Sequence, residues 1–173
     1  RFIGHIRTEA QRLVALIADI IRLSQLDEGV EMPKENVELM SLAGEVAEDL
    51  RAAADKASVT ITTDGQSSVV FGVRRLLYEM LYNLCDNAIK YNRPGGSIRI
   101  HVENREQEAA ISVLDTGIGI APEHQSRIFE RFYRVDKSHS KASGGTGLGL
   151  SIVKHAAMYH GGKVALESEP GRG

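Results

Sequence analysis

One amphipathic segment, residues 73–91, constrains the fold of this chain more than any other feature. At a turn of about 100° per residue its apolar side chains fall on one side, which predicts a helix packed on a core. The core-facing residues are Leu77, Met80, Leu81, Leu84 and Ala88. The polar stripe opposite them consists of Glu79, Asn83, Asp86 and Lys90, with Asn87 at its edge. The apolar side requires a second layer of structure to cover it.

Segments of alternating or β-branched residues predict that second layer. Residues 97–103 and 109–115 alternate like paired strands, and residues 58–63 are rich in β-branched side chains. Further strands are expected at 37–40, 69–71 and 163–168, helices at 41–56 and 146–160, and an irregular stretch at 120–145. Because helices and strands mix without strict alternation, the predicted fold class is α+β, a two-layer sandwich with helices on one sheet.

Residues 1–28 predict a long helix of a different kind. From Ile6 to Ser24 one side of the helix repeats at spacings of 4, 3, 4, 3 and 4 residues, which is typical of coiled coils and helical bundles. Two interpretations stay open: the helix packs on its own domain, or it belongs to a multi-helix dimerisation bundle. Residues 29–36, with Gly29 and Pro33, predict a linker, and residues 37–173 a globular domain.

Composition excludes several classes of protein. The 173 residues include 21 basic and 23 acidic ones without a long basic block, so nucleic acid is not an expected partner. A single cysteine, Cys85, rules out an internal disulfide and favours a buried, inert thiol in a reducing compartment. No apolar run reaches the roughly 18 residues of a membrane span. Both ends interrupt a predicted element, which predicts a piece of a longer protein.

The asparagines of NLCDNAIKYN, residues 83–92, are unusual in the middle of a helix, where asparagine is a mediocre helix former. An amide oxygen is a neutral hard ligand, suited to a Mg²⁺ ion that phosphates already hold. A lysine one turn further on can reach the phosphates as a point charge. A metal–phosphate site and an ordinary solvated helix side both remain compatible with the pattern.

Two glycine motifs add to this picture. DTGIGI, residues 115–120, follows a predicted strand, so Asp115 can accept a hydrogen bond from an exocyclic amine such as adenine N6, or simply close a turn. GGTGLGL, residues 144–150, leads into a helix, where backbone N–H groups form an anion site or the glycines form a hinge. Neither motif is a dinucleotide-binding fingerprint or a Walker A loop.

The segment between these motifs, residues 121–143, has the length of a lid. Its aromatic residues are Phe129, Phe132 and Tyr133, and its basic residues include Arg127, Arg131, Arg134 and Lys137. The aromatics can anchor a lid whose arginines meet phosphate, or they can pack on the core with solvated arginines around them.

In this order, the motifs resemble those of the sensor histidine kinases of two-component signalling. NLCDNAIKYN resembles the N box, DTGIGI the G1 box, IFERFYR (residues 128–134) the F box and GGTGLGL the G2 box. The similarity covers residues 34–173, an ATP-binding domain of the Bergerat type. Residues 1–28, which lead into RLSQLDEG, resemble the second helix of the dimerisation and phosphotransfer domain.

The resemblance implies a role for each matching residue. Asn87 would be the Mg²⁺ ligand with Asn83 beside it, Asp115 would bind adenine N6, and Tyr91 would lie against the ribose or base. Lys90 would contact phosphate, Arg134 the γ-phosphate, and Gly117 and Gly119 would shape the adenine turn. The implied catalytic residues are Asn83, Asn87, Lys90 and Arg134. The implied nucleotide-binding residues are Asn83, Asn87, Lys90, Tyr91, Asp115, Gly117, Gly119, Gly145, Thr146, Gly147, Leu148 and Gly149.

The implied activity is that of an ATP-dependent protein-histidine kinase with ATP and Mg²⁺ as cofactors. The γ-phosphoryl group would pass to a histidine of the dimerisation domain and then to an aspartate of a response-regulator receiver domain. The resemblance further implies a homodimer and the cytoplasmic portion of a membrane sensor, attached through segments outside this sequence.

One departure from the family pattern concerns the phosphoacceptor. The family's acceptor box is absent, and GHIRTEA, residues 4–10, has the wrong spacing for it, so His5 is interpreted as a helix residue that accepts no phosphoryl group. Two alternatives stay open. One is an ATPase of the wider gyrase, heat-shock and mismatch-repair superfamily, with Glu79 as the base that activates water. The other is a non-catalytic dimerising nucleotide-binding module.

Overall fold

The computed structural model of the chain describes residues 2–106, 108–135 and 146–173, and of residues 2–9, 11 and 12 the backbone alone. These residues form two compact units. The first combines Arg1–Glu31 with Ser126–Val164, and the second combines Met32–Gln125 with Ala165–Gly173. Each unit is described by itself below.

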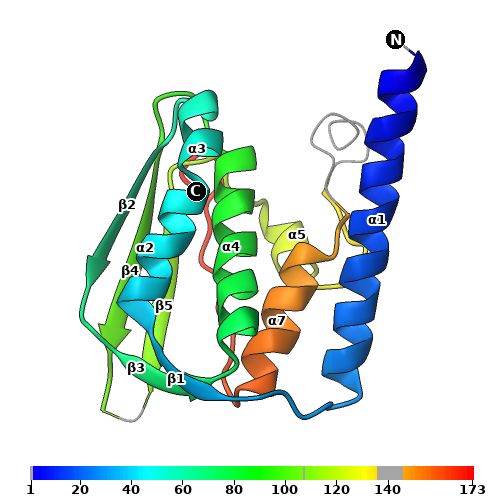
Figure 1. Cartoon of the computed structure of the whole chain (residues 1–173). Helices are drawn as coiled ribbons and strands as arrows, with labels where there is room; N and C mark the ends of the chain where they lie inside the picture. The colour runs from blue at the N-terminus through cyan, green and yellow to red at the C-terminus, as the bar shows by residue number, and fades with distance from the viewer. Residues whose placement is uncertain (1, 107, 136–145) are drawn as a thin grey trace. The chain divides into compact units, whose positions relative to one another are not determined.

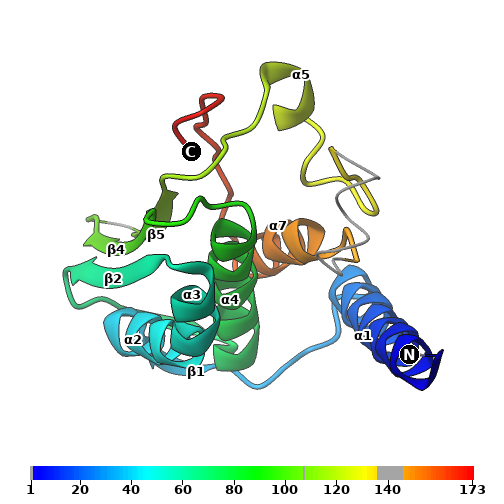
Figure 2. The ribbon, with the colours of Figure 1, turned by 90° about the horizontal axis from the view of Figure 1, so that it is seen from above.

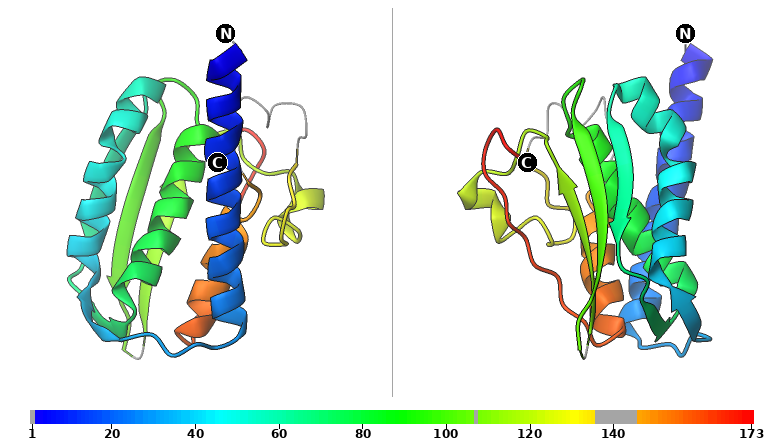
Figure 3. Two further views of the ribbon diagram at one scale, coloured as in Figure 1. Left: turned by 45° about the vertical axis from the view of Figure 1, so that its right-hand side comes forward. Right: turned by 90° about the vertical axis from the view of Figure 1, so that its left-hand side faces the viewer.

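The second unit is a two-layer sandwich (Figure 1). Its elements are β1 (Glu35–Glu38), α2 (Leu39–Asp49), α3 (Arg51–Ala57), β2 (Thr60–Gly65), β3 (Val69–Gly72), α4 (Arg74–Lys90), β4 (Ser97–Asn104), β5 (Ala109–Asp115) and α5 (Pro122–Gln125). One sheet has the order β2-β4-β5, and β1 pairs with β3 in a second, smaller sheet. Helices α2, α3 and α4 lie along one face of the three-stranded sheet (Figures 2 and 3). The predicted α+β sandwich is confirmed.

The alternation of β4 explains why the helices gather on that face. Ile98, Ile100 and Val102 are fully buried, and the residues between them point the other way. They pack with Leu81 and Cys85 of α4 in one continuous hydrophobic cluster. Each large side chain buried in such a core contributes about 1.5–3 kcal/mol relative to its exposed state. The sheet pairs β2 with β4 in parallel and β4 with β5 antiparallel.

Glu38 decides where the first strand ends and the next helix begins. Its carboxylate accepts hydrogen bonds from the backbone N–H groups of Met40 at 3.2 Å and Ser41 at 2.6 Å, so α2 starts at Leu39. These two donors are among those that a helix start leaves unsatisfied. The Ser41 N–H above all holds the pKa of Glu38 down, from 4.5 to about 2. The strand predicted at 37–40 therefore ends two residues earlier.

Two other sequence predictions are wrong in detail. The helix predicted at 41–56 is divided at Leu50 into α2 and α3. The strand predicted at 163–168 is absent from the described residues, because this segment finds no strand partner. Instead the Ser168 hydroxyl donates to the Gly173 carbonyl at 2.8 Å and accepts from the Ile120 N–H at 2.9 Å. These bonds fold the end of the chain into a turn.

In the first unit the helices α1 (Phe2–Asp27) and α7 (Gly149–Tyr159) pack side by side (Figures 1 and 3). Leu23 of α1 joins Leu148 and Ile152 in a buried cluster, against which Leu16 packs. Leu26 is buried as well, whereas five other apolar side chains of α1 are about half exposed or more: Leu13, Val14, Ile17, Ile20 and Ile21. The helix thus packs within its own unit along one side and keeps the broader apolar surface that a bundle requires.

A search of the described helices for a stretch of sufficient length and apolarity to cross a membrane finds none. The domain boundaries at 28 and 36 stay a prediction.

Candidate nucleotide-binding site

Asn83 and Asn87 of the N box are half-buried on α4, one turn apart. The side-chain amide of Asn83 donates to the Glu79 carbonyl at 2.8 Å, which fixes its orientation along the helix. Its amide oxygen then faces away from the backbone and stays available as an acceptor. Asn87 follows at the helical spacing that puts the two side chains on neighbouring positions of one side. This side of α4 offers neutral oxygen ligands next to a lysine.

That lysine is held by a neighbour on the same helix. The Lys90 ammonium lies 2.5 Å from a carboxylate oxygen of Asp86, and about a third of each side chain is exposed, 35% and 26%. An exposed pair one helical turn apart contributes only about 0.3–0.5 kcal/mol. Lys90 can therefore turn toward a phosphate at little cost.

The turn after β5 is built around Asp115. One oxygen of its carboxylate, Oδ1, accepts the N–H of Gly117 at 2.8 Å, which closes an Asx-type turn. Because only Oδ1 is used in the turn, Oδ2 can accept from an exocyclic amine. The two interpretations of DTGIGI are thus compatible: the local turn orients the carboxylate that would bind adenine.

Two glycines of this turn have no room for a side chain. A Cβ at Gly117 would lie 2.5 Å from the Tyr91 carbonyl oxygen and 2.6 Å from Oδ1 of Asp115. Gly119 has a φ of +68°, and a Cβ there would lie 2.0 Å from the Glu169 carbonyl oxygen. Any other residue at either position must displace backbone. The predicted role of Gly117 and Gly119 in shaping the turn has this steric basis.

The second unit brings the N box and the G1 box together. The N–H of Ile118 donates to the carbonyl of Tyr91 at 3.0 Å, so the turn is hydrogen-bonded to the residue that ends α4. The side chain of Tyr91 is 47% exposed. The end of α4 and the turn after β5 therefore lie next to each other.

The first unit brings the F box and the G2 box together. The N–H of Phe132 donates to the Gly147 carbonyl at 2.9 Å, and both residues have positive φ, 63° and 75°. A Cβ at Gly147 would lie 3.1 Å from the Cα of Phe132. A phenylalanine in the left-handed region is uncommon and costs energy, which the surrounding contacts must offset.

Thr146 and Leu148 tie the start of α7 to α1. The Thr146 hydroxyl donates to a carboxylate oxygen of Asp19 at 2.9 Å and accepts the Leu148 N–H at 3.3 Å. The Leu148 side chain is fully buried, so only its backbone is available to a ligand. Gly149 is the first residue of α7. The predicted site residue Gly145 lies outside the described residues, as does Lys137.

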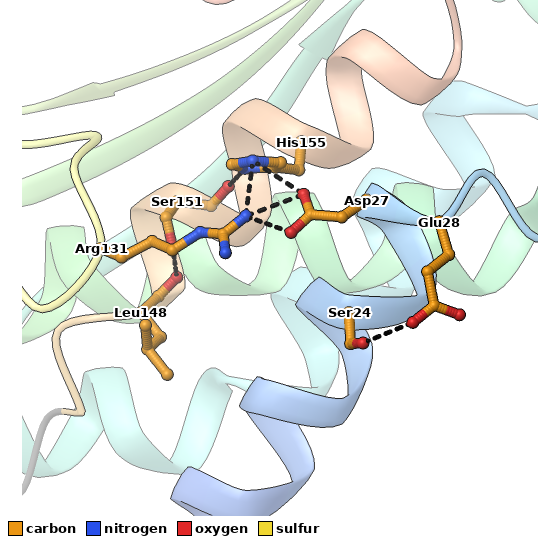
Figure 4. Close-up of polar contacts among 7 residues, drawn as sticks. All are labelled: Ser24, Asp27, Glu28, Arg131, Leu148, Ser151 and His155. Atoms are coloured by element: carbon orange, nitrogen blue, oxygen red, sulfur yellow. Dashed lines mark hydrogen bonds and ion pairs between the residues drawn. The ribbon is translucent and has the colours of Figure 1, made fainter.

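Arg131 of the F box is 41% exposed and pairs with side chains of α1 and α7 (Figure 4). Its guanidinium donates to both carboxylate oxygens of Asp27, at 2.6 and 2.8 Å, and to Nε2 of His155 at 3.1 Å. Nδ1 of His155 donates in turn to the Ser151 carbonyl at 2.7 Å. The hydrogen bond from Arg131 lowers the pKa of Asp27. Sequence reasoning missed Asp19, Asp27 and His155, because nothing local marks residues that pair with a segment over a hundred positions away.

The other aromatic and basic side chains of residues 121–135 divide between packing and solvation. Arg127 pairs with Glu130 at 3.3 Å and lies over the Tyr133 ring, 4.3 Å from its centroid. Phe129 is partly buried, whereas the Phe132 side chain is 58% exposed. Arg134 is half-buried.

Cys85 takes no part in the site. It is fully buried in the core, and desolvation raises the pKa of its thiol to about 12. A thiol of this kind is inert. In the part of the chain that the structure describes, no three histidine, cysteine or acidic side chains gather into a metal site of their own.

The fold and these contacts define a class of protein: an α+β sandwich whose asparagine helix and glycine turn are arranged to bind a nucleotide. Residues 72–173 match the model of the histidine kinase-, DNA gyrase B- and HSP90-like ATPases. The chain therefore belongs to this family of ATP-binding domains.

Individual relatives narrow the comparison. The sensor-like histidine kinase SenX3 of Mycobacterium tuberculosis is 42% identical over 100% of this chain and 43% of its own length. The phosphate regulon sensor protein PhoR of Pseudomonas aeruginosa is 38% identical over 100% of this chain and 40% of its own length. The crystal structure of full-length ShkA in complex with AMPPNP superposes with a TM-score of 0.86 at 26% identity, covering 99% of this chain and 36% of that one.

These similarities confirm the resemblance to sensor histidine kinases and to their catalytic ATP-binding domain. The chain spans less than half the length of the curated relatives it matches.

Proposed function

We propose that this chain is the ATP-binding part of a protein-histidine kinase of a two-component system. The observation that carries the proposal is the hydrogen bond that joins the adenine turn to the end of α4, from Ile118 to Tyr91. It builds one side of a nucleotide site within the second unit before any ligand binds. The similarity to ShkA, which was crystallised with an ATP analogue, supports ATP as the nucleotide.

The adenine end of the site rests on Asp115. Its Oδ2 would accept a hydrogen bond from the N6 amine, and the Gly117 N–H keeps the carboxylate in place through Oδ1. A carboxylate repels the O6 carbonyl that guanine has at the same position, so the site favours adenine. The exposed ring of Tyr91 offers an apolar surface to the base or ribose.

The phosphate end of the site rests on the polar side of α4. The amide oxygen of Asn87 is a hard neutral donor, which fits a Mg²⁺ ion held chiefly by phosphate oxygens, and Asn83 lies one turn before it. Mg²⁺ would neutralise phosphate charge when it arrives with the nucleotide. Lys90 would contact the phosphates after leaving Asp86. These side chains would position the triphosphate and neutralise part of its charge, which is most of what phosphoryl transfer requires.

The G2 box and Arg134 would contribute from the first unit. Backbone N–H groups at the start of α7, from Thr146 to Gly149, suit an anion. Gly147 gives the loop the positive φ and the close approach to Phe132 that the observed turn requires. Gly145 would extend this loop, and Arg134 would stabilise charge on the γ-phosphate.

The acceptor of the γ-phosphoryl group would be a histidine outside this sequence, on the helix that precedes residue 1 in the family. A neutral imidazole nitrogen would attack phosphorus, ADP would leave, and the phosphoryl group would pass on to an aspartate of a response regulator. The exposed apolar side of α1 supports a homodimer through a helical bundle. Attachment to a membrane would be made by segments outside this sequence.

Titration calorimetry tests the site directly. The chain should bind ATP in a Mg²⁺-dependent manner, Asn87→Ala should abolish the magnesium dependence, and Asp115→Asn should abolish the preference for ATP over GTP. Absence of any ATP binding by the wild-type chain would overturn the proposal, and the ATPase alternative with it.

Transfer to a separately supplied acceptor domain tests the reaction. Radiolabelled ATP should label the histidine of that domain in trans, and a label that is stable in base and labile in acid identifies a phosphohistidine. Steady ATP hydrolysis without labelling, abolished by Glu79→Gln, would instead favour the ATPase alternative.

A further inference from the structure

The loop that follows α4 contains Asn92, whose side chain makes several hydrogen bonds within the second unit. Oδ1 of Asn92 accepts from the Arg93 N–H at 2.9 Å and from the Thr116 hydroxyl at 3.3 Å. Its Nδ2 donates to the Ser97 carbonyl at 3.2 Å. One side chain thus connects the end of α4, the start of β4 and the adenine turn.

Thr116 completes this connection from the opposite side. Its hydroxyl accepts the Ser97 N–H at 2.9 Å, and its own N–H donates to the Ser97 carbonyl at 3.1 Å. The hydroxyl lies within donating distance of Oδ1 of Asn92, at 3.3 Å, and of the Ser97 carbonyl, at 3.4 Å. A Cβ on Gly96 would lie 2.1 Å from Oδ1 of Asn92 and 2.8 Å from the Thr116 hydroxyl oxygen. Asn92 and Thr116 can therefore approach each other because Gly96 has no side chain.

We propose that Asn92 and Thr116 form a polar clasp that positions the Asp115 carboxylate relative to Tyr91 and so determines how strongly the site prefers adenine. The inference rests on the proposed function. Neither residue belongs to the proposed nucleotide contacts, so both are positioning residues. Thr116 directly follows Asp115, and Asn92 directly follows Tyr91. Each clasp residue is thus covalently joined to one of the two groups that would contact the base.

The clasp adds a side-chain contact to a turn that backbone hydrogen bonds already hold. The Ile118 N–H donates to the Tyr91 carbonyl at 3.0 Å, and the Thr116 N–H donates to the Ser97 carbonyl at 3.1 Å. The contact between Asn92 and Thr116 joins the residue after Tyr91 directly to the residue after Asp115. It restricts the orientation of the Asp115 carboxylate further, and recognition of N6 by a carboxylate depends on orientation.

Thr116→Val tests the clasp because it keeps the shape of the side chain and removes the hydroxyl. The change removes the donor to Asn92 and the acceptor of the Ser97 N–H, so it should weaken ATP binding at least about fivefold and lower the ratio of ATP to GTP affinity by a similar factor. Thr116→Ser, which keeps the hydroxyl, should restore the ratio. Calorimetric titrations of the whole 173-residue chain with each nucleotide give both quantities.

Thr62→Val is the matched control, because Thr62 is also exposed on the same sheet and its hydroxyl donates to the Ile98 carbonyl at 3.4 Å. It should leave the nucleotide ratio unchanged. Asn92→Ala should lower the ratio of ATP to GTP affinity as Thr116→Val does. If Thr116→Val unfolds below the temperature of the titration, Asn92→Ala serves as the test of the clasp.

An unchanged ratio in Thr116→Val or, if that variant melts, in Asn92→Ala overturns the clasp, and so does an equal change in Thr62→Val. If Asp115→Asn still loses the preference for ATP in the same series, the proposed function stands and only the clasp falls. If the wild-type chain binds no ATP, both fall together.

Discussion

The motifs of the two units are fastened by different contacts. In the second unit, the G1 box is joined to the end of α4 by a backbone hydrogen bond and by glycines with no spare room, such as Gly117. In the first unit, the F box and the G2 box share a backbone hydrogen bond, and side chains fasten them to α1, with Arg131 on Asp27 and Thr146 on Asp19. Backbone contacts persist while the fold persists. Side-chain ion pairs at the surface weaken with salt and pH.

The difference has a consequence for each unit. The turn at Asp115 and the end of α4 belong to the packed second unit and should keep their arrangement over a wide range of salt and pH. The contacts of Arg131 and Thr146 in the first unit should respond to both. Substitutions in the two units should therefore have different effects, which the following predictions order by size.

The largest effect is expected for Gly119→Ala. The new Cβ would lie 2.0 Å from the Glu169 carbonyl oxygen at a φ of +68°, so the turn must move. ATP affinity measured by calorimetry should fall more than about tenfold. Gly95→Ala is the control, since Gly95 also has a positive φ, of +82°, but no neighbour within 4 Å. Equal losses in both variants would mean that backbone strain alone, and not the contact with Glu169, matters.

The next effect concerns acid stability of the second unit. Folding lowers the pKa of Glu38 from 4.5 to about 2, first of all through the Ser41 N–H. A carboxylate with a lowered pKa stabilises the fold fully above its unfolded value and loses that contribution as pH falls. Stability measured by urea unfolding should thus decline between pH 4.5 and about 2. Glu38→Gln should be less stable at neutral pH and should flatten this decline. A wild-type slope retained in Glu38→Gln would assign the titration to other carboxyls.

A smaller, local effect is expected for Arg131→Gln in the first unit. Without Arg131, Asp27 loses its charged partner, and amides in the last turn of α1 should exchange with solvent several-fold faster. The pKa of Asp27 lies below its ordinary 3.8, so the contact is present above that pH and is lost as pH falls through the lowered value. Hydrogen exchange with mass spectrometry resolves this segment.

Arg127→Gln is the matched control for that experiment. Arg127 directly precedes the F box and pairs with Glu130 three residues on, within its own segment. It should leave α1 exchange unchanged. The same acceleration in both variants would show that the charge of this segment as a whole, and not the contact with Asp27, holds α1.

The smallest effect is expected for Asp86→Asn. This change releases Lys90 and removes a negative charge near the phosphates, so ATP should bind about twofold more tightly at low salt. The gain should disappear in high salt. Glu48→Gln removes a similar exposed pair with Arg51 and should change nothing. Tighter binding in both variants would indicate a general charge effect.

Much of the fold follows from local sequence patterns. The polar stripe of α4 and the alternation of β4 and β5 predict these elements within a residue or two, because period and burial are encoded in neighbouring residues. The strand predicted at 163–168 is wrong, because a local pattern says nothing about the partner strand. A strand needs a partner as well as a pattern, and this segment bonds to Ile120 and Gly173 instead.

The candidate site residues are likewise predictable where neighbouring residues in the sequence define their surroundings. Asp115 and the asparagines are recognisable from motifs, since their neighbours in the sequence define the turn and the helix around them. The contacts of Ile118 with Tyr91 and of Arg131 with Asp27 join segments far apart along the chain. No local pattern encodes these contacts.

The parallel pairing of β2 with β4 has a consequence for how the molecule reaches its native state. Parallel strands cannot be joined by a hairpin, so the chain from Gly65 must travel back before Ser97 can lie beside Thr60, and α4 makes that return. The helix that carries the asparagines is thus also the connection without which the sheet cannot close. Loops of this length make folding slow, and the binding surface should appear only in the rate-limiting step. Nucleotide added to a refolding chain should leave the folding rate unchanged and slow unfolding alone.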